Sequence, residues 1–390
     1  MDAIGDDKRG DLHEFEITAD NTALLTIYHT IPYNLTAWDI GNSTSPGYIR
    51  DCLFQEIDLE TDELIYEWSA IEHVPIEDCY TKPNGEGKTY DNAWDWFHLN
   101  SVEKDDRGNY LISARYSHSL FYINGNSSET VWTLGGKNSS FEDLSGGNAS
   151  SIKRQHHARW STIGTPGTQR AITVFDNGEK PNPSRGLKVL LDEKAMTVQI
   201  LAEAYHPLGY ISASQGSIQQ LPSGNLLVGW GYAPAFSEFS HDGSEVLCDM
   251  QFAALHNNGS WSPGAQESYR VYRQPWQGWP LQDPEVVVDR REGVMYMSWN
   301  GATEVRSWTV KGTKTSKAKG KPAESVYSAK KLAFETSIEV DVVHYKEFTL
   351  TALGEDEAVL GSWSVGFQGV IEVRFRLIHC SKPDCITDQL

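Results

Sequence analysis

The sequence predicts an all-β fold, a β-propeller of four-stranded antiparallel blades, and three observations support this prediction. First, residues that favour strands are abundant, with 13 Trp, 17 Tyr and 13 Phe in a chain of 390 residues. Second, apolar and polar residues alternate in short runs that end in turns of Asp, Gly or Asn, which is the pattern of β-hairpins. Third, this pattern recurs along the chain without clear helical periodicity. A β-sandwich is the alternative, but it does not account for the repetition.

The strand–turn–strand pattern occurs five times, at intervals of about 55 to 85 residues. Comparable positions in the five units are Ile17, Val102, Ile163, Ile218 and Val287. Such spacing is typical of propeller blades. The last 50 residues add further strands, which form either a sixth blade or a small appended sheet. We therefore predict a propeller, six-bladed and incomplete at its N-terminal side, over residues 1–340, followed by C-terminal strands over 341–390.

The charge of the chain argues against a nucleic acid partner. It carries 53 acidic and 33 basic residues, a net charge of −20, which repels a phosphate backbone. The single basic run, residues 311–331, is predicted to be a solvated loop. No apolar run approaches the roughly 20 residues that a membrane span needs, so we expect no membrane partner.

Five cysteines occur, and none lies at a spacing typical of a metal site. We predict no metal and no cofactor. The two cysteines that flank a short loop near the C-terminus could pair, and so could the first two, but the pairing cannot be decided from the sequence. The five are Cys52, Cys79, Cys248, Cys380 and Cys385.

Six Asn-x-Ser/Thr sequences are candidate N-glycan acceptors in polar, turn-like stretches, and they favour the secretory pathway or an extracellular location. Against this, the first residues lack the apolar segment of a signal peptide. Either the leader is absent from this chain or the protein is intracellular. The acceptors are Asn34, Asn42, Asn126, Asn138, Asn148 and Asn258.

Several residues that could take part in catalysis or binding occur in and near "WDWFHLN". His98 and Asn100 alternate with Leu99, and because side chains alternate along a strand they should face the same way. Arg115 ends the next strand-like run, "YLISAR". Each of these residues could also have a purely structural role: His98 could pack in the core, Asn100 could cap a turn, and Arg115 could pair with a carboxylate such as Asp95.

The same stretch and several others resemble the arylsulfotransferase family, in its fungal branch. The resemblance extends from residue 11 to about 310, and it is carried by "DLHEFEIT", "LFQEIDLETDELIYEWSA", "WDWFHLNSVEKDDRGNYLISAR", "VWTLGGKNSSF", "QHHARW", "SASQGSIQQLPSGNLLVGWGYAPAFSEFS" and "MSWNGATEV".

This resemblance implies a six-bladed propeller with its site over the central channel. It also implies that a sulfuryl group passes from an aryl sulfate to a histidine and then to a phenol, without the nucleotide donor PAPS. His98, Asn100 and Arg115 match site positions of the family, His156 looks like the histidine that carries the sulfuryl group, and His13 resembles a further site histidine.

Two departures from the family pattern are visible. The family carries Asp at the position of His157, so the residue that would orient His156 is missing from the motif. Family members also carry roughly one further blade of sequence before the "DLHEF" motif.

The residue types suit sulfuryl transfer. A neutral imidazole is a competent nucleophile near pH 7, and Arg115 and Asn100 offer donors to the sulfuryl oxygens. His98 or His13 could protonate the departing phenol oxygen. Aromatic residues would bind the small phenolic or aryl sulfate substrate, and the candidates are Trp230, Tyr232 and Trp299.

Two other functions stay open. One is a natural-product propeller that guides a cycloaddition, such as a hetero-Diels–Alderase, in which the aromatic residues would line the pocket and His156 would matter little. The other is a propeller that binds a partner without catalysis. Both would fail to release phenolate from an aryl sulfate.

Overall fold

A computed structural model describes residues 3–42, 45–161, 169–253, 266–314 and 324–367, together with the backbone of 373–374 and 377–380. The chain divides into two compact units, Met1–Arg273 and Gln274–Leu390, and each is described by itself.

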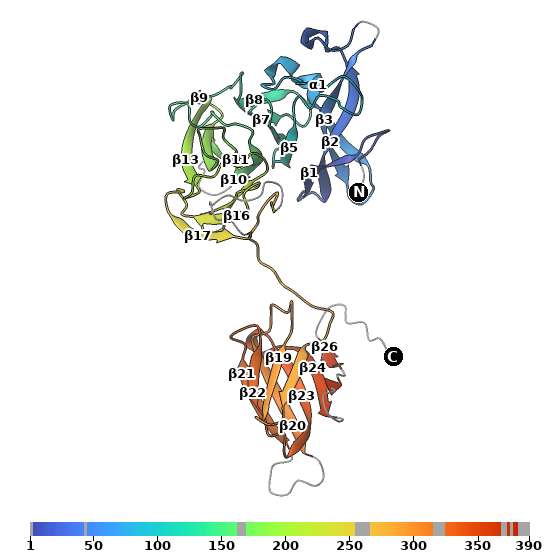
Figure 1. Cartoon of the computed structure of the whole chain (residues 1–390), viewed down its shortest axis with the longest axis vertical. Coiled ribbons are helices and arrows are strands. Elements are labelled where there is room, and N and C mark those ends of the chain that lie inside the picture. The colour runs from blue at the N-terminus through green and yellow to red at the C-terminus, as the bar shows by residue number, and fades with distance from the viewer. Residues whose placement is uncertain are drawn as a thin grey trace. The chain divides into compact units, whose positions relative to one another are not determined.

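The described residues of unit 1 form four sheets, each with four antiparallel strands that pair in sequence order, and one of these sheets has a fifth strand, which is parallel (Figure 1). The first sheet is β1 (Gly10–Ile17), β2 (Thr22–Tyr33), β3 (Gly47–Asp58) and β4 (Leu64–Ser69). The second is β5 (Leu99–Lys104), β6 (Tyr110–Ala114), β7 (Ser119–Ile123) and β8 (Thr130–Gly135). The third is β10 (His156–Ser161), β11 (Gln169–Asp176), β12 (Arg185–Asp192) and β13 (Thr197–Tyr205), with the short β9 (Glu142–Asp143) parallel to β13. The fourth is β14 (Ser217–Gln220), β15 (Leu226–Gly229), β16 (Ala235–Phe239) and β17 (Val246–Gln251).

An aspartate closes many of the hairpins, which confirms the predicted turn signals. Asp58 Oδ1 accepts hydrogen bonds from the N–H groups of Glu60 and Thr61 at 2.8 and 2.9 Å, after β3. Asp105 and Asp192 cap the turns after β5 and β12 in the same way. Because a carboxylate at a strand end satisfies the turn amides, each such residue fixes the register of its hairpin.

The core of unit 1 lies between neighbouring sheets. One apolar cluster, which includes Phe54 and Phe97, joins the first and second sheets. A second, which includes Trp132 and Val189, joins the second and third sheets, and a further cluster with Trp230 joins the third and fourth. Strand β12 is buried on both faces, as expected for a strand in a sheet covered by other sheets.

The first strand of each sheet neighbours the first strand of the next, in the order β1, β5, β10 and β14. The strands in the three pairs β1–β2, β5–β6 and β10–β11 shift register near their beginnings. These irregular beginnings carry the polar residues His13, Asn100 and His156, and His98 directly precedes β5. Bulges of this kind re-aim side chains away from the regular alternation of a strand.

Unit 2 contains two sheets. A three-stranded sheet pairs β18 (Glu285–Asp289), β19 (Val294–Ser298) and β22 (Thr336–Glu339). The other sheet has the order β21 (Glu324–Lys330), β20 (Ser307–Lys314), β23 (Tyr345–Leu353) and β24 (Val359–Phe367), with β25 (Val373–Arg374) and β26 (Leu377–Cys380) both pairing with β24. Its apolar core includes Trp308, Phe348 and Trp363.

The all-β class and the four-stranded antiparallel sheets are thus as predicted for the first four repeats. The fifth repeat differs, because β18 pairs with β19 and β19 pairs with β22, whereas β20 joins another sheet. After residue 340, β23 pairs with β20 and β24 pairs with β23, so these strands belong to the same unit as residues 274–340. The division therefore falls after Arg273 instead of after residue 340. Non-local pairing of this kind leaves no mark in the local alternation of residues.

Other predictions can be compared directly. The basic run is not a plain loop, since both of its ends form the β20–β21 hairpin. Cys52 and Cys79 are free, buried thiols, so their pairing is wrong, while Cys385 and the Cys380 side chain lie outside the described residues. Helix is confined to Thr36–Trp38, Ala70–His73, Ile76–Asp78 and Glu355–Glu357 in the described parts, and none of these turns could cross a membrane.

Candidate functional site

Three histidines from three sheets of unit 1 come together. The ring centroids of His13 and His98 are 4.8 Å apart, in an edge-on arrangement. His13 stacks on Tyr28 at 5.2 Å, and His98 lies 4.9 Å from Tyr116. His156 reaches the same group through Tyr269, whose ring lies 5.8 Å from His13 and 6.1 Å from His156.

Each of these imidazoles is held through its Nδ1 atom. His13 Nδ1 contacts Asp11 Oδ1, and His98 Nδ1 contacts Asp95 Oδ2. Burial would raise the pKa of Asp11, but its hydrogen bond to His13 and the charge of that ring lower it. Because Nδ1 is occupied in both rings, the Nε2 atoms are available for chemistry.

His156 has a neutral partner instead of a carboxylate. Its Nδ1 lies 2.6 Å from Asn177 Oδ1. The Asn177 amide nitrogen donates to the carbonyls of Ser212 and Gln215 at 3.0 and 2.9 Å, so Oδ1 must face the imidazole and Nδ1 must carry the proton. Nε2 is then the unprotonated nitrogen, and it accepts a long 3.3 Å contact from the Gln215 N–H.

The surroundings keep His156 uncharged. Burial lowers its pKa well below the usual value, and the positive charges of Arg115, His98 and His13 act in the same direction, while the Asn177 hydrogen bond opposes them. The pKa of His98 is lowered by burial too, although Asp95 partly compensates. A neutral imidazole therefore sits beside rings that have carboxylate partners.

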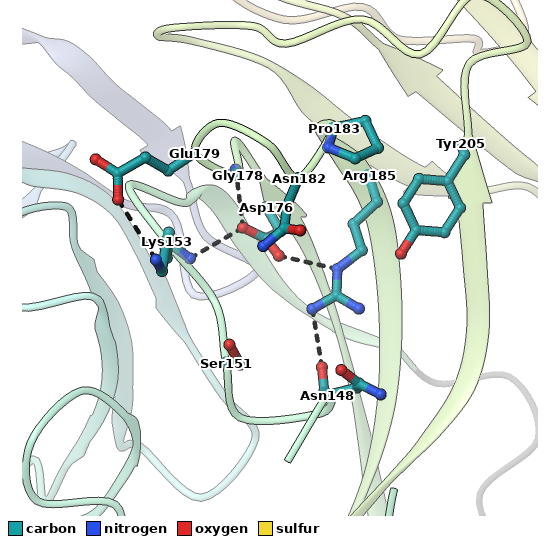
Figure 2. A pocket seen from close by; sticks show the side chains of 10 residues that line it. All are labelled: Asn148, Ser151, Lys153, Asp176, Gly178, Glu179, Asn182, Pro183, Arg185 and Tyr205. Atoms are coloured by element: carbon teal, nitrogen blue, oxygen red, sulfur yellow. Dashed lines mark hydrogen bonds and ion pairs between the residues drawn. The ribbon is translucent and has the colours of Figure 1, made fainter. Parts of the chain in front are cut away.

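The loop that carries Asn177 is fixed by its neighbour Asp176. Figure 2 shows the Asp176 carboxylate between Lys153, Gly178 and Arg185. It accepts hydrogen bonds from the Lys153 N–H at 2.9 Å, the Gly178 N–H at 3.0 Å and Arg185 Nε at 2.9 Å. The charged groups around this pocket are paired, Lys153 with Glu179 and Arg185 with Asp176. These contacts hold the loop next to Asn177 in place.

Arg115 approaches the cluster from the end of β6. Its guanidinium lies 4.9 Å from the centre of the Tyr116 ring, and Nη2 donates to the Ala213 carbonyl at 2.9 Å. Burial lowers its pKa from the usual arginine value, but an arginine stays charged. Asp95 pairs with His98, so the alternative in which it pairs with Arg115 is wrong.

Asn100 is fully buried at the β5 bulge, and its amide nitrogen donates to the Gln155 carbonyl at 2.7 Å. Its Oδ1 atom has no partner among the described residues, so Asn100 offers a hydrogen-bond acceptor, whereas the sequence suggested a donor. His98 precedes β5 and has a positive φ of 58°, so the expected alternation through Leu99 does not hold there. Such backbone strain is often kept at functional sites.

Buried polar atoms without a hydrogen-bond partner concentrate at this place. Across the described residues 13 side-chain atoms are of this kind, and seven belong to residues of this cluster or directly bonded to it. Since buried polar atoms are normally satisfied, such a concentration is typical of a site whose polar groups await a ligand. The seven are Asp95 Oδ1, Asn100 Oδ1, Arg115 Nε, Gln155 Oε1, Gln215 Oε1, Tyr269 Oη and Arg270 Nε.

His157, which replaces the aspartate of the motif, is not part of the cluster. Its Nε2 lies 2.9 Å from the Tyr272 hydroxyl and its Nδ1 accepts from the Ile218 N–H at 3.3 Å. It lines a separate pocket of about 230 Å³ with Glu103 and Arg159. The role expected for that aspartate, orientation of His156, falls to Asn177 here.

The aromatic residues expected to bind substrate lie elsewhere. Trp230 has no exposed surface and its Nε1 donates to Ser237 Oγ, so it packs in the core of unit 1. Trp299 is buried in the core of unit 2, where its Nε1 donates to the Gln282 carbonyl. Tyr232 is partly exposed, and its N–H donates to the Ser214 carbonyl next to Gln215. The tyrosines that do contact the histidines are Tyr28, Tyr116 and Tyr269.

Within the described residues no group of three or more His, Cys, Asp or Glu side chains is arranged to hold a metal ion. The cluster instead combines one neutral imidazole, two carboxylate-bound imidazoles, a guanidinium and several phenols. These groups suit nucleophilic attack on an anionic group together with proton transfer to an oxygen.

The fold and the site define an all-β protein with a histidine cluster at the irregular starts of neighbouring strands. A family model described as arylsulfotransferase (ASST) matches residues 2–253, more than half of the chain. The chain therefore belongs to the arylsulfotransferase family, and the match covers every site residue above except Tyr269 and Arg270. The fungal branch of that resemblance stays a prediction.

A search of curated proteins found no match. Solved structures similar to the chain include the GH43 protein BlXynB from Bacillus licheniformis, at 8% identity and a TM-score of 0.30 over 94% of this chain and 77% of that one. They also include the polysaccharide lyase Uly1, at 9% identity and a TM-score of 0.31, with 96% and 82% of the two chains covered. Hydrazine synthase from Kuenenia stuttgartiensis is 8% identical, with a TM-score of 0.31 over 84% and 75%.

Proposed function

We propose that the protein transfers a sulfuryl group from an aryl sulfate to a phenol, with His156 as the group that carries it. The observation on which the proposal rests is the difference among the three histidines. His156 is held neutral by burial and has an uncharged amide as its partner, whereas His13 and His98 are bound to carboxylates. A nucleophile must be unprotonated. For His98, the Asp95 carboxylate opposes the lowering of the pKa by burial, which is the direction that a general acid needs.

In the first step His156 Nε2 forms a bond to sulfur while the bond from sulfur to the phenolic oxygen breaks. The electron pair of that bond leaves with the phenolate oxygen, which takes a proton from Nε2 of His98 or His13. In the second step the acceptor phenol returns its proton to the same histidine and attacks sulfur, and the N–S bond breaks. Atoms and charges balance over the two steps without another reactant.

Arg115 is the charged group that would meet the sulfuryl oxygens. Its Nε has no partner among the described residues, and the guanidinium adds a positive charge that burial leaves poorly screened. Asn100 Oδ1 would accept a hydrogen bond from the acceptor phenol or from a protonated histidine.

The test is release of 4-nitrophenolate from 4-nitrophenyl sulfate in the presence of phenol, followed between about pH 6 and 9, around the ordinary pKa of histidine. We expect phenol to accelerate release and to be recovered as phenyl sulfate. A covalent sulfuryl group on His156, detected by peptide mapping after quenching without acceptor, would identify the carrier. Absence of turnover across that range would refute the function.

The closed six-bladed ring and the secretory location belong to this proposal. The four sheets of unit 1 would be successive blades. Five of the glycan acceptors are exposed, and Asn258 lies outside the described residues. Expression in a eukaryotic secretory host, with mass loss on treatment with an N-glycosidase, would support glycosylation at these sites. The five are Asn34, Asn42, Asn126, Asn138 and Asn148.

A further inference from the structure

Residues 268–273 form a strap that lies along β14 and brings a tyrosine to the histidine cluster. The Tyr269 carbonyl accepts from the Gly216 N–H at 3.1 Å, and the Ser268 N–H donates to the Gly231 carbonyl at 3.2 Å. Further along, the Val271 N–H donates to Ser217 Oγ at 2.9 Å. The strap is therefore fixed to the fourth sheet on both sides of Tyr269.

Arg270 fixes the strap to the first and second sheets. Its Nη2 donates to the His13 carbonyl at 2.9 Å and to the Asn100 carbonyl at 3.2 Å. Its guanidinium also binds both oxygens of the buried Glu14 carboxylate, at 2.5 and 3.0 Å. Burial would raise the pKa of Glu14, but the charges of Arg159 and Arg270 lower it, so the ion pair persists. Tyr269 is thus held between sheets that carry the candidate catalytic groups.

The Tyr269 ring lies at the centre of the cluster, edge-on to His13 at 5.8 Å and to His156 at 6.1 Å. Its hydroxyl is buried and has no hydrogen-bond partner among the described residues. By contrast, the Tyr28 hydroxyl in the same cluster donates to the Leu99 carbonyl at 2.8 Å. A buried hydroxyl normally has a partner, so the partner of Tyr269 is expected to be a ligand.

We propose that Tyr269 is a catalytic residue whose hydroxyl donates a hydrogen bond to a sulfuryl oxygen while sulfur moves between the phenol oxygen and His156. This inference rests on the proposed function, and it extends the site beyond the residues that the family model matches. Tyr269 keeps its proton throughout, so the balance of the two steps is unchanged.

The environment favours a donor over an acceptor of the sulfuryl group. Burial raises the pKa of Tyr269, and the charges of Glu14 and Asp11 add to this effect against those of Arg270 and Arg115. The phenol therefore stays protonated, and a protonated phenol is a weak nucleophile. A donor that is fixed before the reaction costs no reorganisation when negative charge develops on the sulfuryl oxygens.

The experiment compares Tyr269→Phe with Tyr272→Phe in the full chain. Both variants lose one hydroxyl from the same strap, but Tyr272 is half exposed and contacts His157 outside the cluster. We expect Tyr269→Phe to lower kcat/KM for 4-nitrophenyl sulfate by about 10²-fold, the usual effect of one lost donor to a developing anion. Tyr272→Phe should stay within about twofold of the unaltered protein. Equal losses in both variants, or no loss in Tyr269→Phe, would overturn the proposal.

A series of aryl sulfates with different leaving groups distinguishes a sulfuryl donor from a general acid. A donor to the sulfuryl oxygens is needed whatever phenol departs, so the loss in Tyr269→Phe should be similar for all members. A loss that grows as the leaving phenol becomes more basic would show that Tyr269 protonates the leaving group instead. A sulfate ester found on Tyr269 by peptide mapping would likewise contradict the donor role.

A binding measurement separates this inference from the proposed function. Calorimetric titration of the unaltered protein and both variants with inorganic sulfate requires no turnover. We expect Tyr269→Phe to weaken sulfate binding several-fold and Tyr272→Phe to leave it unchanged. If the unaltered protein turns nothing over but shows this pattern, the function is wrong and the anion-binding role of Tyr269 stands. If turnover occurs and Tyr269→Phe changes neither kcat/KM nor sulfate binding, the proposed function stands and the anion-binding role of Tyr269 is wrong.

Discussion

The two units of the chain bury different kinds of residue. Among the described residues, unit 1 buries every polar or charged side chain that is buried at all except Thr336, which lies in unit 2. The core of unit 2 is otherwise apolar, with Trp308, Phe348 and Trp363 among its members. Polar groups are costly to bury and persist where they are paired or needed for a ligand.

The same local pairing has different surroundings in the two units. In unit 1, Asp95 and His98 are three residues apart, and their side chains are 14% and 17% exposed. In unit 2, Asp341 and His344 have the same spacing, but the histidine is 38% exposed. The first pair lies beside another imidazole and near the Arg115 guanidinium. Under the proposed function, catalysis belongs to unit 1, where several strands bring histidines together, and unit 2 contributes a packed apolar core.

The largest expected effect comes from the carrier histidine. His156→Ala should lower aryl sulfate turnover by roughly 10⁴-fold or more, because it removes the nucleophile. His344→Ala removes the comparable histidine of unit 2 and should leave kcat/KM unchanged. Initial rates with 4-nitrophenyl sulfate measure both, and circular dichroism checks the fold. Comparable activity in the two variants would break the assignment of chemistry to unit 1.

Unit 2 should respond to a change in its core through stability alone. Trp308 is 1% exposed. Trp308→Ala should lower the free energy of unfolding of unit 2 by about 3–5 kcal/mol, as for other large core truncations. Denaturant titration followed by tryptophan fluorescence measures this loss. The kcat/KM of the protein that stays folded should not change, and a parallel fall in kcat/KM would show that the site depends on unit 2.

Asn177 tests whether an uncharged partner distinguishes His156 from the other two histidines, whose partners are carboxylates. In Asn177→Asp a carboxylate would face the imidazole, which stabilises the protonated ring and raises its pKa. The acidic limb of the pH profile of kcat/KM should then move to higher pH, with a loss of about 10- to 100-fold at pH 7 from the displaced proton and the weaker packing.

The control for Asn177 is His157→Asn, which changes the neighbouring residue outside the cluster while keeping a side chain that tolerates the positive φ of 54° at this position. Its pH profile should match that of the unaltered protein. If Asn177→Asp lowers the rate without moving the profile, Asn177 supports the structure and does not tune His156.

The sheets of unit 1 were predicted from the sequence because hairpins leave local marks, whereas His13 and His156 were candidates only through the resemblance to the family. The turn at Asp105, for example, follows from an aspartate and a glycine between alternating runs. The partners of the histidines were not predicted. Asn177 follows β11 in a "DNG" stretch that reads as an ordinary turn, and its contact with His156 depends on how β10 and β11 pair.

Tyr269 shows the limit more clearly. It lies far beyond His156 along the chain, in a stretch without a motif, and only the path of the strap along β14 brings it to the cluster. Trp230 shows the opposite error, because an aromatic residue in a family stretch suggested a ligand pocket but packs in the core. Composition identifies which residues are apolar, whereas exposure depends on how sheets meet.

The smallest expected effect concerns Glu103, which lines the pocket around His157, away from the histidine cluster. Burial raises its pKa to about 7, although the charge of Arg159 and the hydrogen bond from the Trp160 N–H oppose this. A carboxyl whose folded pKa is raised contributes full stability below its unfolded pKa, about 4.5, and loses that contribution as pH rises toward 7. Glu103→Gln should therefore be more stable than the unaltered protein at pH 8 by about 1 kcal/mol, and equal to it at pH 4.5. Thermal unfolding at the two pH values measures the difference, and kcat/KM should not change because the residue lies outside the cluster. A stability gain that is the same at both pH values would mean that ionisation of Glu103 does not destabilise the folded protein. A buried charge in unit 1 outside the histidine cluster would then cost no more stability than an apolar side chain does in unit 2.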